Sequence, residues 1–230
     1  MKFQACLINL FSFLHGVLFS QSCLPEGITF TSQGQIDSFA SYYPDCNRLE
    51  GYTNIEGDDI THLDSLFGID TIGGNLSIRG NPLLRSLNGL DNLRVVNGNL
   101  HLGYWEHGSN PLLTDMTGLG KLHYVGGELL FLGNASLLNF RGLDSLEEIG
   151  LWFSINENPS LKSFDGLYSL HSVGEIDILG NDSLTSLNGL QGLENVTFSV
   201  SVQYNPILSS LDGIENINAD SMLFLRLQNR

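Results

Sequence analysis

Few residues in this sequence have the types and spacing that metal binding would require. The densest group is His101, Glu106 and His107, since two imidazoles and a carboxylate are a common zinc ligand set. Their spacing does not place both histidines on one face of a helix, and no cysteine accompanies them. We therefore predict no metal site.

Paired carboxylates are the other candidates for chemistry. The segment from Glu56 to Asp59 is acidic enough to suggest calcium, but it lacks further oxygen ligands at regular spacing. Glu147 and Glu148 are adjacent and most simply explained as solvated charges. No nucleophile elbow, phosphate-binding loop or dinucleotide fingerprint is present. We predict no catalytic residues, no enzymatic activity and no cofactor.

The dominant feature of the chain is an internal repeat. One asparagine recurs in each copy, at spacings of 23 to 29 residues, and its positions are Asn81, Asn110, Asn134, Asn158, Asn181, Asn205 and Asn229. A Gly-Leu pair follows each of the earlier asparagines at a fixed distance, as in Gly142-Leu143. A fixed period in the low twenties is typical of a solenoid, in which each coil buries its apolar side against its neighbours.

Each repeat contains the pattern of one short strand followed by turns. Before the asparagine, apolar residues alternate with others, as in Leu76-Ser-Ile78, which predicts a strand with one face buried. Proline often follows the asparagine, as at Pro82, and ends the strand. Leucines then recur every three residues, which fits a coil that turns repeatedly.

We predict that the asparagine column is structural. A buried amide is tolerated only when its donors and acceptors are paired, and stacked asparagines can bond to each other and to neighbouring backbone. Asn134 and Asn181 also begin Asn-x-Ser sequons. These two belong to the buried column, and the further sequons at Asn75 and Asn195 are equally weak signals, so we do not predict glycosylation.

Residues 1–22 have the pattern of a secretory signal peptide, with one lysine, an apolar run and small residues at the end. The alternative is a membrane anchor, but Asn9 and His15 interrupt the run. Export leaves Cys23 and Cys46 as the only cysteines, and an oxidising compartment would pair them in a disulfide. Lipidation of Cys23 is the competing interpretation.

The N-terminal segment resembles the start of the receptor L domain family, known from the insulin and epidermal growth factor receptors and from bacterial surface proteins. The matching residues are Cys23, Pro25, Gly27, Cys46, Leu49, Glu50 and Gly51, and Gln35 to Tyr43 resembles a short capping helix. The resemblance implies a mostly β protein that forms a right-handed parallel β-solenoid and is located at the cell surface. It implies no enzymatic activity. It divides the chain into a cap over 23–48 and about eight coils over 49–230, without the C-terminal cap usual in the family. The chain therefore looks like a fragment.

The C-terminal coil is predicted to be exposed at its end. Leu223, Leu225 and Leu227 begin another strand, and no capping segment follows them in this sequence. An uncovered apolar coil with a free strand edge favours self-association.

The charge balance limits the partners. Twenty-five acidic and ten basic residues give a net charge of −15, which argues against nucleic acid and anionic membranes. No segment after residue 22 is apolar enough to span a bilayer. We predict a secreted or cell-surface protein.

Strand alternation also predicts which side chains point outward. Most are polar, but an apolar island is expected at Leu130, Leu132, Trp152 and Leu179, with His101 at its rim and with Trp105 and His107 on a neighbouring insertion. The alternative is that another segment covers these residues. Exposed aromatic clusters commonly mark interaction surfaces. We predict a binding or adhesion module that presents a parallel sheet to a protein or glycan. The alternatives are a structural spacer and a polysaccharide lyase or hydrolase.

Overall fold

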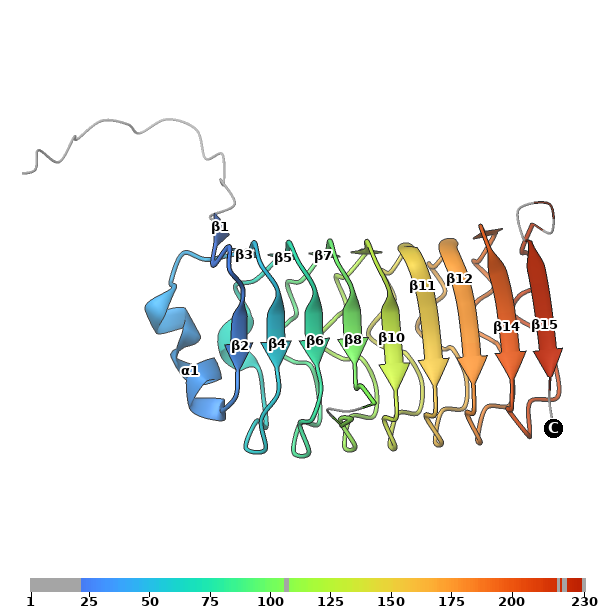
Figure 1. Ribbon diagram of the computed structural model, residues 1–230, viewed down its shortest axis with the longest axis horizontal. Coiled ribbons are helices and arrows are strands. Elements are labelled where there is room, and N and C mark those ends of the chain that lie inside the picture. The colour runs from blue at the N-terminus through green and yellow to red at the C-terminus, as the bar shows by residue number, and fades with distance from the viewer. Residues whose placement is uncertain (1–21, 106–107, 219, 221–222, 229–230) are drawn as a thin grey trace, which may run out of the picture.

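The chain forms a parallel β-solenoid of about eight turns, as predicted (Figure 1). The computed structural model describes residues 22–105, 108–218, 220 and 223–228. Every pairing between the strands is parallel, and consecutive coils place equivalent residues in register. The in-register stacking explains the alternation of apolar residues in the sequence. Each strand must turn the same side towards the interior of the solenoid as its neighbours do.

The strands form two rows along the solenoid. The main row runs across the face seen in Figure 1 and comprises β2 (Ile28–Phe30), β4 (Thr53–Ile55), β6 (Leu76–Ile78), β8 (Leu100–Leu102), β10 (Leu129–Leu132), β11 (Glu148–Asn156), β12 (Ser172–Leu179), β14 (Ser199–Gln203) and β15 (Phe224–Gln228). The second row comprises β1 (Ser22–Cys23), β3 (Arg48–Leu49), β5 (Thr71–Ile72), β7 (Val95–Val96), β9 (Tyr124–Val125) and β13 (Asn195–Val196). The long strands β11 and β12 take part in both rows.

One helix, α1 (Gln33–Tyr42), covers the N-terminal end of the solenoid beside β2, and a short 3₁₀ helix, η1 (Asp64–Leu66), packs against it (Figure 1). This confirms the predicted capping helix, which begins two residues earlier than expected. Ile36 and Phe39 are buried on its inner side. Parallel pairing already begins with β1 and β2, inside the segment predicted as a cap.

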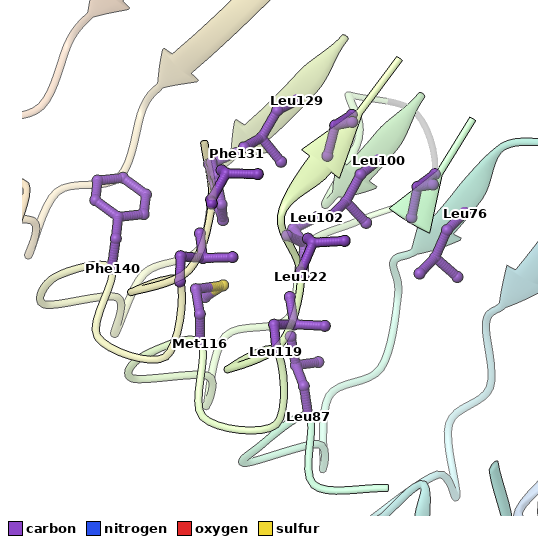
Figure 2. Packing of buried hydrophobic residues seen from close by; sticks show 14 of the residues in the cluster. Leu76, Leu87, Leu100, Leu102, Met116, Leu119, Leu122, Leu129, Phe131 and Phe140 are labelled. Carbon is purple, nitrogen blue, oxygen red and sulfur yellow. The ribbon is translucent and has the colours of Figure 1, made fainter. Parts of the chain in front are cut away.

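The core consists of apolar columns, each built from equivalent residues of successive coils. Figure 2 shows one such column, in which Leu76, Leu100 and Leu129 follow each other on adjacent strands. Leucines of the turns that recur every three residues, such as Leu84, Leu87 and Leu90, fill the opposite side and are fully buried. In the middle coils phenylalanines occupy some of these core positions, both on strands and in turns, and the rings of Phe131 on β10 and Phe140 in the following turn lie 4.8 Å apart in an edge-to-face arrangement. Such contacts stabilise a core beyond the burial of area alone.

The predicted asparagine ladder is present from Asn81 to Asn205, and every member is fully buried; Asn229 lies outside the described residues. In a typical step, Nδ2 of Asn134 donates to the carbonyl of Leu102, 2.8 Å away. The backbone N–H of Asn134 donates to Oδ1 of Asn158 in the next coil. Both ends of each amide are thereby paired, which is why a polar column is tolerated inside an apolar solenoid.

The Gly-Leu pair has a separate steric cause. Gly142 has φ of +100°, and a Cβ built on it would lie 2.2 Å from the carbonyl oxygen of Met116 in the preceding coil. The same positive φ and the same close approach recur at Gly118 and Gly166. Only glycine permits both the backbone conformation and the close stacking of coils at this corner.

The predicted disulfide joins Cys23 to Cys46, with the two Cα atoms 5.8 Å apart. It links β1 to the segment just before β3, so it fastens the N-terminal end of the solenoid. Among the described residues, no helix has the length and apolar character needed to cross a bilayer. The predicted signal peptide falls almost wholly on residues 1–21, which lie outside the described residues.

Candidate binding groove

The candidate site lies on the outer face of the main sheet, where register aligns one residue from every strand. The central row runs Thr29, Asn54, Ser77, His101, Leu130, Ser154, Asp177, Ser201 and Arg226. The solenoid thus brings together side chains that are far apart in the sequence, and the two halves of this face differ in how their side chains are used.

In the N-terminal half the outward side chains bind one another. Arg79 forms a salt bridge of 3.0 Å with Glu56, and its guanidinium lies over the ring of Tyr104. The Tyr104 ring stacks on His101, with centroids 6.0 Å apart. His101 in turn contacts Glu128. We call this set, together with Ser154, the polar chain.

Glu128, which lies just before β10, links His101 to Ser154 within the polar chain. Its Oε2 is 3.1 Å from Nε2 of His101, and its Oε1 accepts a hydrogen bond of 2.9 Å from Ser154. The hydrogen bond with His101 is the main cause that lowers the pKa of Glu128; burial acts in the opposite direction. The carboxylate is therefore held ionised and already paired on both oxygens.

The predicted exposure of Leu130 and Leu132 is wrong, since only 6% and 3% of their surfaces are exposed. Leu130 lies in register between His101 and Ser154, the two residues that Glu128 bridges, so this network closes over it. The carbonyl of Leu132 lies against Gly103, where the insertion leaves β8. Leu179 is partly exposed and Trp152 is 50% exposed. The four residues therefore do not form a continuous apolar island.

The C-terminal half of the face instead contains a groove of about 450 Å³. We call it the β11–β15 groove, and its lining residues are Trp152, Ser154, Glu175, Asp177, Ser199, Ser201, Gln203, Phe224 and Arg226. Trp152 lies in register with Glu175, and Ser199 lies in register with Phe224. The two aromatic residues therefore lie at opposite ends of a polar floor.

A comparison between coils shows that this groove departs from the repeat. At the position of Trp152, the earlier coils have Asn75 and Asn99, whose side chains accept hydrogen bonds from the backbone of the next coil. From Glu128 onward the equivalent residues are Trp152, Glu175, Ser199 and Phe224. Structural repetition does not require these types, so the change marks this column as a candidate binding surface.

A second change at the neighbouring corner adds apolar surface. The corner residues Gly74, Gly98 and Gly127 are joined by backbone hydrogen bonds between successive coils. The same series continues with Leu151 and then, after Gly174, with Phe198. Both side chains are exposed. The edge of the groove that runs from Trp152 to Phe224 is therefore bordered by exposed apolar side chains.

Asp177 is the most perturbed acid of the groove. Burial is the main cause that raises its pKa, and the nearby charge of Glu175 adds to it; the hydrogen bond with Ser201 and the charge of Arg226 act against the rise. A carboxylate kept in an environment that disfavours its charge is a common feature of binding sites.

The insertion does not contribute to this groove. Trp105 is exposed, but it follows the carboxyl end of β8, whereas Trp152 precedes the part of β11 that pairs with β10, the neighbour of β8. His107 and Glu106 lie outside the described residues. Within the described part of the chain, no group of three or more His, Cys, Asp or Glu side chains is arranged to hold a metal ion.

Sequence reasoning identified Trp152 but missed Phe224, Arg226 and the corner residues Leu151 and Phe198. The missed signal was available in the repeat itself, because aligning the coils shows where asparagine and glycine give way to other types. Comparison with known proteins adds nothing to this picture: no family model, no curated protein and no solved structure matches the chain.

Proposed function

We propose that this protein is an exported, non-enzymatic binding or adhesion module that presents its main sheet to a protein or glycan. The observation that carries the proposal is the contrast within one face. The side chains of the polar chain bind one another, whereas the β11–β15 groove places two exposed aromatic residues beside an acidic, hydroxyl-rich floor. Exposed aromatic residues beside polar groups are typical of interaction surfaces.

Export and the receptor L domain relationship belong to the same proposal. The apolar N-terminal segment, the Cys23–Cys46 disulfide and the acidic composition support an extracellular location. The cysteine and glycine pattern of the first 51 residues, and the solenoid with its capping helix, support a receptor L domain type of module.

One observation favours a second candidate function, a polysaccharide hydrolase or lyase. Glu175 and Asp177 point to the same face two residues apart, and the pKa of Asp177 is raised, mainly by burial. A pair of carboxyl groups is the usual apparatus of glycosidic bond hydrolysis. The third possibility, a structural spacer, requires no ligand.

A binding screen of residues 23–230 against immobilised glycans and against a fractionated secretome tests the proposal. Saturable binding that is lost on Trp152→Ala supports a binding module. Release of shortened glycan products on incubation would instead support the hydrolase or lyase. Failure to bind any glycan or protein in either screen would leave the spacer as the function.

A further inference from the structure

We propose that the β11–β15 groove binds an uncharged oligosaccharide, which lies across the strands with its end units against Trp152 and Phe224. This proposal rests on the proposed binding function and names the ligand class of the same face. Three properties of the groove lead to it: its side-chain chemistry, its direction and its charge.

The side-chain chemistry matches the hydroxyl groups of a sugar. The floor contains three serine hydroxyls, one glutamine amide, two carboxylates and the guanidinium of Arg226. Ser154 already donates to Glu128, and Gln203 donates to Ser201, so a ligand would use the remaining donors and acceptors of these groups. Hydroxyls and amides can both donate and accept, and each carboxylate accepts through two oxygens, so a ligand rich in hydroxyl groups finds partners along the floor. Trp152 and Phe224 offer apolar ring faces, on which the C–H faces of sugar rings stack.

The direction of the groove follows the axis of the solenoid. It crosses β11, β12, β14 and β15, which at about 4.8 Å per strand gives a length of about 14 Å between the outer two. This span accommodates a short oligosaccharide. The equivalent positions of successive strands repeat at a constant interval, as do the units of a linear glycan.

An extended peptide is a poorer occupant of this face. The backbone of β12 pairs with β11 on one side and with β14 on the other, so no free strand edge lies in the middle of the groove for a peptide to extend. A peptide lying across the strands would have to rely on side-chain contacts, without the main-chain hydrogen bonds that give such complexes their affinity. Within the described residues, the strand edge at the groove that has no partner is that of β15, at the end of the groove.

The charge of the groove selects among glycans. Glu175 and Asp177 carry two negative charges and Arg226 carries one positive charge, which leaves a formal charge of −1. The whole chain carries −15. Sulfated and uronic-acid glycans are therefore repelled, and the single excess charge does not demand a basic ligand.

The test uses residues 23–230 and a panel of probes: uncharged β- and α-linked oligosaccharides from disaccharide to hexasaccharide, heparin and alginate oligosaccharides, and arginine-rich peptides. We expect binding to at least one uncharged series, with affinity that rises with length and then levels off. In a Trp105→Phe background Trp152 is the only tryptophan, so its fluorescence should change with saturation.

Substitutions locate the ligand. Trp152→Ala should weaken binding at least about tenfold, and Asp177→Asn should also weaken it. Trp105→Ala is the matched control, since Trp105 is an exposed tryptophan outside the groove, and it should leave the affinity unchanged. Circular dichroism and urea unfolding of each variant verify that it is folded. If Trp152→Ala fails to fold, the affinity of Trp152→Phe and the fluorescence titration of Trp152 in the Trp105→Phe background show whether the ligand contacts this position.

The outcomes separate this proposal from the proposed function. Binding of a secretome protein that depends on Trp152, with no oligosaccharide bound, overturns the glycan assignment but retains the binding module. Preference for polyanionic glycans or arginine-rich peptides, or oligosaccharide binding sensitive only to Trp105→Ala, likewise overturns it. Absence of any binding partner overturns both.

Discussion

Nε2 of His101 on β8 lies 3.1 Å from Oε2 of Glu128, the residue that precedes β10. The hydrogen bond with His101 lowers the pKa of this carboxyl, and burial only partly offsets it. A carboxyl whose pKa is lower in the folded state stabilises the fold at pH values above its unfolded pKa. That stabilisation is lost as the pH falls through the folded pKa.

Glu128→Gln should therefore lower the free energy of unfolding at neutral pH by about 1–2 kcal/mol, because charged hydrogen bonds to His101 and Ser154 are weakened. The difference from the unsubstituted chain should shrink as the pH falls below the folded pKa of Glu128. Urea unfolding at neutral and acid pH measures this. Glu194→Gln, on an exposed corner, is the control and should have little effect. An equal loss at both pH values would contradict the electrostatic origin.

The asparagine ladder gives a second prediction. Asn134→Ala removes the donor to the Leu102 carbonyl and the acceptor for the backbone of Asn110, and both backbone groups stay buried. The expected loss of stability is about 1–3 kcal/mol. Asn97→Ala, at an exposed corner, should be nearly neutral. Thermal and urea unfolding of the two variants measure this difference. Equal stability of Asn134→Ala and Asn97→Ala would refute the structural role of the ladder.

The glycine corner gives a third prediction with a close control. Gly142→Ala places a Cβ against the carbonyl of Met116 at a positive φ, so it should destabilise the fold by about 1–3 kcal/mol or more. Gly120→Ala adds the same methyl group where no atom lies within 4 Å, and its φ is outside the positive range. It should have no effect or a slight stabilising one. Comparable losses in both variants would show that stacking is not what selects glycine at residue 142.

Asp177 gives a prediction in which the pH dependence of stability is opposite to that of Glu128. Burial and the charge of Glu175 raise the pKa of this carboxyl, so its contribution to stability is present below its unfolded pKa and is lost as the pH rises through the folded pKa. Asp177→Asn should therefore raise the free energy of unfolding at neutral pH, and the gain should disappear on acidification. Asp182→Asn, an exposed control, should show no such change. A loss of stability in Asp177→Asn at neutral pH would mean that its hydrogen bond with Ser201 outweighs burial.

The fold was predictable because the repeat carries redundant information about register. Asn134 and Asn158 occupy the same column in the sequence and are hydrogen bonded in the structure. One misplaced residue would turn the apolar side of a strand outward, so the alternation allows a single solution. The pairing of Cys23 with Cys46 followed from their being the only cysteines outside the predicted signal peptide.

The site was harder to predict because exposure depends on contacts between coils. Leu130 points outward as alternation requires, yet it is buried by a network that joins His101, Glu128 and Ser154. A pattern of alternating residues predicts which side of the strand a side chain lies on, but it does not predict how far neighbouring side chains reach or in which direction. Phe224 and Arg226 became part of the groove only through the register of β15 on β14.

The C-terminal coil provides the last prediction. Leu225 and Leu227 lie in register with the buried Val200 and Val202, so they occupy core columns, but they remain about half exposed. Within the described residues, β15 pairs only with β14. An apolar end with a free strand edge favours contact with another molecule, although the net charge of −15 opposes close approach. We therefore expect residues 23–230 to self-associate as concentration and ionic strength rise, which sizing with light scattering measures. Replacing both leucines by lysine should abolish the association, while Leu138→Lys, an exposed leucine of a middle coil, should not. A chain that stays monomeric across all concentrations and salt conditions would exclude this coil as an interface.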